Sequence, residues 1–120
     1  MDKWGYMFQT DLPLYDCVDR IVCLPWEFTA PRYSTPLWYK CEMISATQLL
    51  ITFTGGLHRR SKHTEYRLEF YTENQRTVIE MYFSKELFGL PAMTTTQDID
   101  AFMSQKIMAT RVGDCYRREQ

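Results

Sequence analysis

Many of the patterns that would indicate catalysis, metal binding or redox chemistry are missing from this chain of 120 residues. Its four cysteines, Cys17, Cys23, Cys41 and Cys115, include no Cys-x-x-Cys pair, which excludes the usual zinc-ribbon and thioredoxin-type motifs. The chain has only two histidines, and their spacing does not match a usual zinc site. It shows no phosphate-binding glycine loop, dinucleotide fingerprint or Ser/His/Asp set. We therefore expect no cofactor and no metal, and elimination favours a binding protein over an enzyme.

Long apolar segments and a strong net charge are also missing. No stretch approaches the roughly 18–20 apolar residues that cross a bilayer, so we expect no membrane partner. Residues 1–6 do not resemble a secretory signal peptide, which makes a cytoplasmic location the simplest expectation, with a mature chain whose leader was removed as the alternative. The formal net charge of −1 provides no global field that would attract nucleic acid. In a cytoplasmic protein the cysteines are expected to be reduced and mostly buried.

What the chain does contain is a high share of aromatic residues, 15%. A chain of this length fits a single domain spanning 1–120, and it can bury a core without metals or disulfides. Large aromatic side chains increase the area buried per residue, and some of them are expected on the surface. Tyr and Trp are favoured at protein interfaces because they add contact area at low entropic cost.

Residues 37–84 have the alternating pattern of four short antiparallel strands. The last two strands are joined by a turn at 73–76. If Glu73 faces Arg76, every inward apolar residue meets another across the hairpin, in the pairs Phe70–Ile79, Leu68–Met81 and Tyr66–Phe83. A slip of one residue would break all three pairs, so we predict this register.

Two amphipathic helices are predicted, one before this meander in the sequence and one after it. The first covers about 12–23, where apolar residues recur at helical spacing after a capping side chain and Pro13. The second covers about 96–110, and Thr95 with Asp98 resembles a capping box at its start. We expect Gly113 to end this helix and residues 114–120 to form a polar tail.

The N-terminus adds a further expected strand, since Trp4, Tyr6 and Phe8 alternate with smaller or polar residues. An antiparallel sheet with one apolar face needs a cover, which the two helices can supply. The sequence therefore predicts an α+β fold. In it, a four-stranded antiparallel meander (about 37–84) with an N-terminal strand is covered on one face by helices at about 12–23 and 96–110.

A basic loop between the second and third strands of the meander is the only local concentration of charge of one sign. Arg59 and Arg60 are suited to bidentate bonds with carboxylate or phosphate groups. The alternative interpretation is a solvated hairpin tip. The loop is too short to indicate a nucleic-acid-binding protein by itself. Its candidate partner-binding residues are His58, Arg59, Arg60, Lys62 and His63.

The outer face of the predicted meander, opposite the helices, mixes aromatic residues with charges of both signs, as a protein-binding sheet would. In the predicted register Glu69 faces Glu80, and Arg67 is near enough to compensate this like-charge pair. Paired carboxylates also occur in glycosidases, but such a site needs a cleft, which an open sheet does not supply. The other alternative is that the N-terminal strand, the proline-rich segment 25–36 or a second subunit covers this face. The candidate partner-binding residues here are Arg67, Glu69, Tyr71, Glu80 and Tyr82.

Two functional hypotheses follow from these patterns. The favoured one is a small protein-binding inhibitor that occludes a partner protein, a toxin or an enzyme, as bacterial toxin-immunity proteins and phage-encoded inhibitors do. It rests on elimination and on the compact size of the chain rather than on a motif. The alternative is a domain that binds nucleic acid or an anionic ligand through the basic loop 57–63, with a strong dependence on salt.

Overall fold

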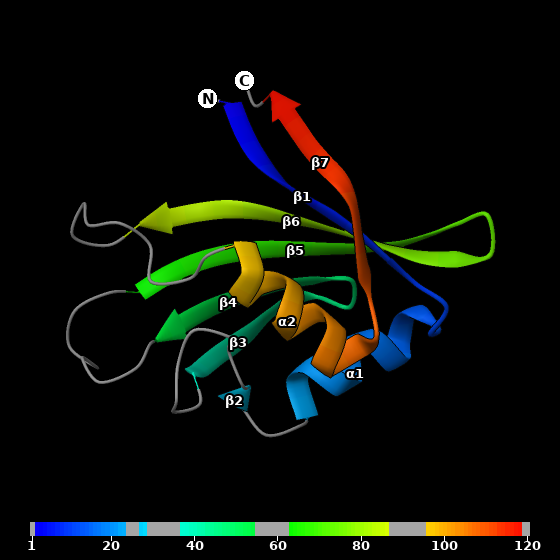
Figure 1. Ribbon diagram of the computed structural model, residues 1–120, viewed down its shortest axis with the longest axis horizontal. Coiled ribbons are helices and arrows are strands. Elements are labelled where there is room, and N and C mark those ends of the chain that lie inside the picture. Colours follow the sequence, from blue (N-terminus) through cyan, green and yellow to red (C-terminus); the bar gives the residue numbers. More distant parts are fainter. Residues whose placement is uncertain (1, 24–26, 29–36, 55–62, 87–95, 119–120) are drawn as a thin grey trace.

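The computed structural model describes residues 2–23, 27–28, 37–54, 63–86 and 96–118 (Figure 1). These residues form seven strands and two helices, so the α+β class is confirmed. In chain order the elements are β1 (Asp2–Thr10), α1 (Leu14–Cys23), β2 (Glu27–Phe28), β3 (Leu37–Ser45), β4 (Gln48–Thr54), β5 (His63–Glu73), β6 (Arg76–Glu86), α2 (Thr96–Ile107) and β7 (Thr110–Arg118).

All seven strands belong to one antiparallel sheet with the order β2-β3-β4-β5-β6-β1-β7. The predicted meander is present as β3 to β6, and β1 is the predicted N-terminal strand, paired with β6. The expected number of strands was too small. The two-residue β2 adds one edge, and β7 adds the other by pairing with β1, so the two ends of the described chain lie side by side (Figure 1).

The predicted register of the last hairpin is confirmed. Glu73 lies opposite Arg76, and the three apolar pairs of the prediction, Phe70–Ile79, Leu68–Met81 and Tyr66–Phe83, are all present. The two turn residues, Asn74 and Gln75, have positive φ angles of 51° and 65°. Positive φ at both central residues belongs to the tight turns whose twist matches that of the flanking strands. The turn and the apolar pairs therefore specify the same register.

Both helices lie against the same face of the sheet (Figure 1), as predicted. Tyr39 of β3 shows how closely they pack. Its hydroxyl donates a 2.8 Å hydrogen bond to the carbonyl of Ile21 in α1, and its ring meets Phe102 of α2 edge-on at 5.0 Å. The core between helices and sheet comprises Phe8, Cys17, Val18, Ile21, Tyr39, Leu49, Ile51, Tyr66, Leu68, Phe70, Ile79, Met81, Ile99, Phe102, Met103, Ile107 and Ala109.

The end of α2 differs from the prediction. The helix stops at Ile107 instead of near residue 110, because Met108 adopts a left-handed φ of 54°. The amide of Met108 donates to the carbonyl of Ser104, and the amide of Ala109 donates to the carbonyl of Met103. Bonds of this kind close a helix C-terminus after a left-handed residue, a place that glycine usually takes. The expectation that Gly113 ends the helix was therefore wrong.

The predicted polar tail was also wrong, because Thr110–Arg118 forms β7. This strand occupies the edge of the sheet. Of its residues 110–116, for which burial is described, only Cys115 is buried. An edge strand that buries so little has no need of an alternating apolar pattern. Its polar sequence is typical of edges that resist pairing with other chains.

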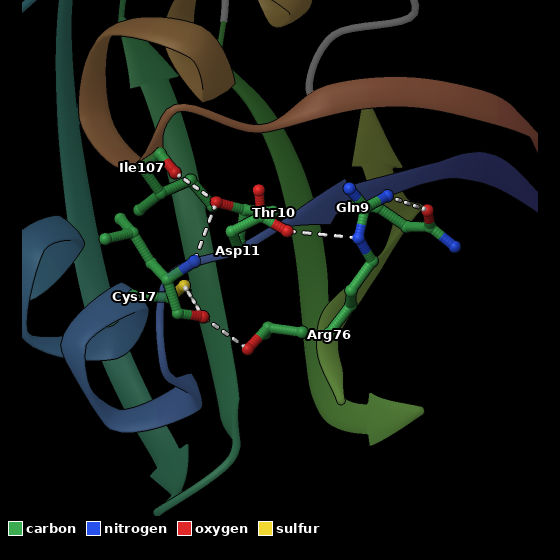
Figure 2. Close-up of polar contacts among 8 residues, drawn as sticks. Gln9, Thr10, Asp11, Cys17, Arg76 and Ile107 are labelled. Carbon is green, nitrogen blue, oxygen red and sulfur yellow. Dashed lines mark hydrogen bonds and ion pairs between the residues drawn. The ribbon is translucent and has the colours of Figure 1, made fainter. Parts of the chain in front are cut away.

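A group of hydrogen bonds around the turn that follows β1 joins β1, α1, α2 and β6 (Figure 2). Thr10 at the end of β1 donates to the carbonyl of Ile107 and accepts from the amide of Leu12. Thr77 of β6 donates to the carbonyl of Leu12 at 2.6 Å. Nearby, Arg76 pairs with Asp11 at 3.0 Å on the surface. These contacts fix the point from which β1 and β7 run together.

Among the residues described, neither helix is long and apolar enough to cross a membrane.

Candidate functional site

The structure describes six of the ten predicted contact residues. His58, Arg59, Arg60 and Lys62 lie outside the described residues, so the role of the basic loop stays a prediction. His63 is the first residue of β5 and lies opposite Thr54. The other five candidates share the outer face of the sheet, because they alternate with residues of the helix-facing core; they are Arg67, Glu69, Tyr71, Glu80 and Tyr82.

A relay of side-chain hydrogen bonds joins β4 and β5 around Glu69. Glu69 lies directly opposite Glu80, as predicted. Arg67 does not reach it directly in the contacts described; its Nη2 donates to Oε1 of Gln48 at 3.1 Å, and Nε2 of Gln48 donates to Oε1 of Glu69 at 3.3 Å. Gln48 on β4 thus bridges Arg67 and Glu69, and the predicted compensation of the like-charge pair by Arg67 stays a prediction. All three side chains are half-buried, which strengthens such polar contacts relative to open solvent.

Glu80 is held by two tyrosines. The hydroxyl of Tyr71 donates to Oε2 of Glu80 at 2.8 Å, and the hydroxyl of Tyr82 donates to Oε1. Burial and then the hydrogen bond to Glu80 raise the pKa of Tyr71 to about 12, and the same causes raise the pKa of Tyr82. Both hydroxyls therefore stay protonated at neutral pH and act as donors. The arrangement stabilises one carboxylate on the sheet surface.

Tyr82 is far more buried than an outer-face residue of an open sheet would be, with 2% of its surface exposed. It lies opposite Gly5 of β1, which in turn lies opposite Cys115 of β7. Since Gly5 has no side chain, the hydroxyl of Tyr82 comes within hydrogen-bond reach of the Cys115 thiol. Val78 on the same face is fully buried. Part of the outer face is therefore buried, and Tyr82 does not belong to the surface that a partner could contact.

Sequence reasoning missed a second surface, at the outer ends of β1 and β7. Trp4 is 67% exposed and Tyr116 is 45% exposed, and they are direct cross-strand partners with ring centroids 4.5 Å apart. Tyr6 continues the row, with the guanidinium of Arg111 5.6 Å from its ring. We call Trp4, Tyr6 and Tyr116 the β1–β7 aromatic surface. The alternation of Trp4, Tyr6 and Phe8 predicted half of it, but Tyr116 fell in the expected tail.

The electrostatics of this second surface are mixed. Asp114 lies directly opposite Tyr6 on the same face. Arg111 pairs with Asp100 of α2 at 3.3 Å, so its charge is already balanced. A surface that combines aromatic rings with both signs of charge suits recognition of another protein better than recognition of a polyanion.

Among the described residues, no group of three or more His, Cys, Asp and Glu side chains is arranged to hold a metal ion. No protein-family model, curated protein or solved structure matches the chain.

Proposed function

We propose that this protein is a small protein-binding inhibitor that neutralises a partner by occlusion, in the manner of bacterial toxin-immunity proteins and phage-encoded inhibitors. The observation that carries the proposal is the exposed pair formed by Trp4 and Tyr116. Trp and Tyr are enriched among the residues that dominate binding energy at protein interfaces. Two such rings in tilted contact on the surface, with their centroids 4.5 Å apart, offer a large apolar contact area next to charged groups.

The backbone beneath this pair supports a preformed contact. β1 pairs with β7 from Asp2 to Gln9 and with β6 from Gly5 to Thr10, so Trp4 lies next to the part of β1 that is held on both sides and is itself paired with Tyr116. Binding a partner through rings that already contact each other costs less conformational entropy than ordering them on binding. A rigid surface of this kind suits an inhibitor that acts by covering the working surface of its partner.

The predicted outer-face residues provide a second, separate surface. Arg67, Glu69, Tyr71 and Glu80 are half-buried and bonded within the sheet, and they point away from the helices, whereas Trp4 and Tyr116 share the helix-facing side. We assign the main anchor to the β1–β7 aromatic surface. The outer-face residues and the basic loop then orient the complex through charge, which affects association rate more than affinity.

The test is co-purification from the native host at physiological salt, followed by mass spectrometry and measurement of Kd with the recovered partner. The double variant Trp4→Ala/Tyr116→Ala should weaken binding by about 30-fold or more, as expected for loss of dominant interface residues. Tyr15→Ala is the matched control, since Tyr15 is 65% exposed on α1 and should tolerate the change without loss of binding.

Recovery of the chain alone would count against the proposal. So would a partner whose affinity is unchanged in the double variant, because the contact would then lie elsewhere. Recovery of a nucleic acid whose binding falls steeply with salt would instead favour a domain that uses the basic loop 57–63.

A further inference from the structure

A cavity of about 220 Å³ opens beside the ends of β1 and β7 that hold Trp4 and Asp114, and it reaches Tyr66 of β5 across β6. Among the residues that the structure describes, its lining consists of three aromatic side chains, one carboxylate and one glycine, namely Trp4, Tyr6, Tyr66, Asp114 and Gly5. Ligand sites for drug-sized molecules are usually about 300–1,000 Å³, so this smaller cavity suits a single side chain or a comparably small group.

The sheet register explains why these groups converge. Tyr6 and Asp114 are cross-strand partners, and Trp4 is the residue two positions before Tyr6 on the same face. Tyr66 belongs to the helix-facing core, so it approaches from the same side of the sheet. Gly5 contributes backbone between the two aromatic residues of β1. The cavity is thus built from strands whose positions the sheet fixes.

Its chemistry favours a cation. The face of an aromatic ring carries partial negative charge and attracts ammonium groups, and Trp and Tyr are the preferred rings. Asp114 adds a full negative charge at the rim, and it makes no ion pair among the described residues. Arg111 already places a guanidinium 5.6 Å from the Tyr6 ring, but Asp100 balances its charge. The lining residues that the structure describes include no basic side chain.

We propose that this cavity binds an alkylammonium group, supplied by a lysine side chain of the partner protein. The methylene stem of lysine would lie along Trp4 and Tyr66, and its ammonium would meet Tyr6 and Asp114. The source of the ammonium rests on the proposed function, whereas the preference of the cavity for a cation rests on its lining alone.

The test uses the whole protein and a small probe, so it does not depend on finding the partner. Nα-acetyl-lysine N-methylamide is titrated at low salt while the amide NMR signals of Gly5, Tyr6 and Asp114 are followed. We expect saturable shifts of these signals in the millimolar range. The norleucine analogue, which lacks the ammonium, should bind about fivefold more weakly or not at all.

Asp114→Asn should weaken binding of the lysine probe by about fivefold, because the substitution removes the charge and keeps the shape. Asp19→Asn is the matched control, since Asp19 is an exposed carboxylate on α1 outside the cavity lining. The inference is overturned if the lysine probe produces no shifts, if the norleucine analogue binds equally well, or if Asp114→Asn changes nothing.

The outcome is separable from that of the proposed function. A captured partner whose affinity is lowered by Trp4→Ala/Tyr116→Ala but not by Asp114→Asn would leave the inhibitor proposal standing and refute a lysine of that partner as the occupant of the cavity. Selective binding of the lysine probe, with no protein partner recovered, would support the cation site and refute the inhibitor proposal.

Discussion

The hydroxyl of Thr10, at the end of β1, donates a buried hydrogen bond of 2.8 Å to the carbonyl of Ile107, 97 positions away at the end of α2 (Figure 2). The same oxygen accepts the amide of Leu12 at 3.2 Å. One side chain thereby satisfies a terminal helix carbonyl and a turn amide that would otherwise lack partners. It also fixes the end of α2 near the end of β1, from which β7 starts its pairing with β1.

Replacing Thr10 with Val keeps the shape of the side chain but removes both bonds. Because the carbonyl of Ile107 is left buried without this partner, we expect the free energy of unfolding to fall by about 1–3 kcal/mol. Thr10→Ser retains the hydroxyl and should lose less. Urea unfolding of the two variants measures the difference. Equal stability of Thr10→Val and the unmodified protein would show that the bond contributes nothing net.

Gly5 and Gly113 form a matched pair for testing the close approach of β1 to β6. A Cβ atom added at Gly5 would lie 2.1 Å from the carbonyl oxygen of Met81, whereas one added at Gly113 would meet nothing within 4 Å. We therefore expect Gly5→Ala to destabilise the fold by at least about 1–3 kcal/mol, the usual cost of overpacking. Gly113→Ala should be neutral or slightly stabilising. Thermal unfolding of both variants measures the two changes in stability. Similar losses of stability in Gly5→Ala and Gly113→Ala would contradict the steric explanation.

The parts of the fold that could be predicted from sequence are those in which the decisive contacts are local. Tyr66, Leu68 and Phe70 alternate within a hairpin whose partner strand follows directly, so the pattern and the turn fix the register together. β7 could not be found in this way. Its contacts join residues far apart in the sequence, since the thiol of Cys115 donates to the carbonyl of Tyr6, 109 positions away. Its own side chains are mostly exposed where burial is described.

The same distinction applies to the candidate sites. The predicted register placed Glu69 opposite Glu80 with Arg67 nearby, and in the structure the three residues lie on one face of the sheet. The sequence did not predict the burial of Tyr82, because that burial depends on Gly5 of β1, whose place beside β6 was not predicted, and on Cys115 of β7, which was not predicted as a strand. The sequence did not predict the cavity for the same reason. Asp114 belongs to the predicted polar tail, whereas in the structure it lies in β7 opposite Tyr6.

Tyr71 gives the stability a defined dependence on alkaline pH. Burial and the bond to Glu80 raise its pKa from 10.0 to about 12, so the folded state favours the protonated phenol. The resulting stabilisation is fully present below pH 10 and is lost as the pH rises toward 12. Tyr82 shifts in the same direction. We expect stability to fall over this range, and to fall less steeply in Tyr71→Phe. Urea unfolding at several pH values tests this; identical slopes in the two proteins would refute it.

Glu80 distinguishes a structural role for the outer face from a contact role. Glu80→Ala removes the acceptor of two tyrosine hydroxyls, one of them on the buried Tyr82, so we expect a loss of about 1–3 kcal/mol even though it relieves the repulsion with Glu69. Glu80→Gln keeps an acceptor and should lose less. Glu42→Ala, at an exposed position on β3, serves as the control and should be nearly neutral.

If Glu80 acts mainly within the sheet, partner affinity should change little in Glu80→Gln, while Trp4→Ala/Tyr116→Ala loses it. A strong loss of affinity in Glu80→Gln, with stability unchanged, would move the main contact to the outer face. An interface on the outer face predicts that Glu80→Gln loses affinity, whereas an interface on the helix-facing side predicts that Trp4→Ala/Tyr116→Ala loses it. Measuring unfolding and binding on the same proteins therefore assigns the interface to one of them.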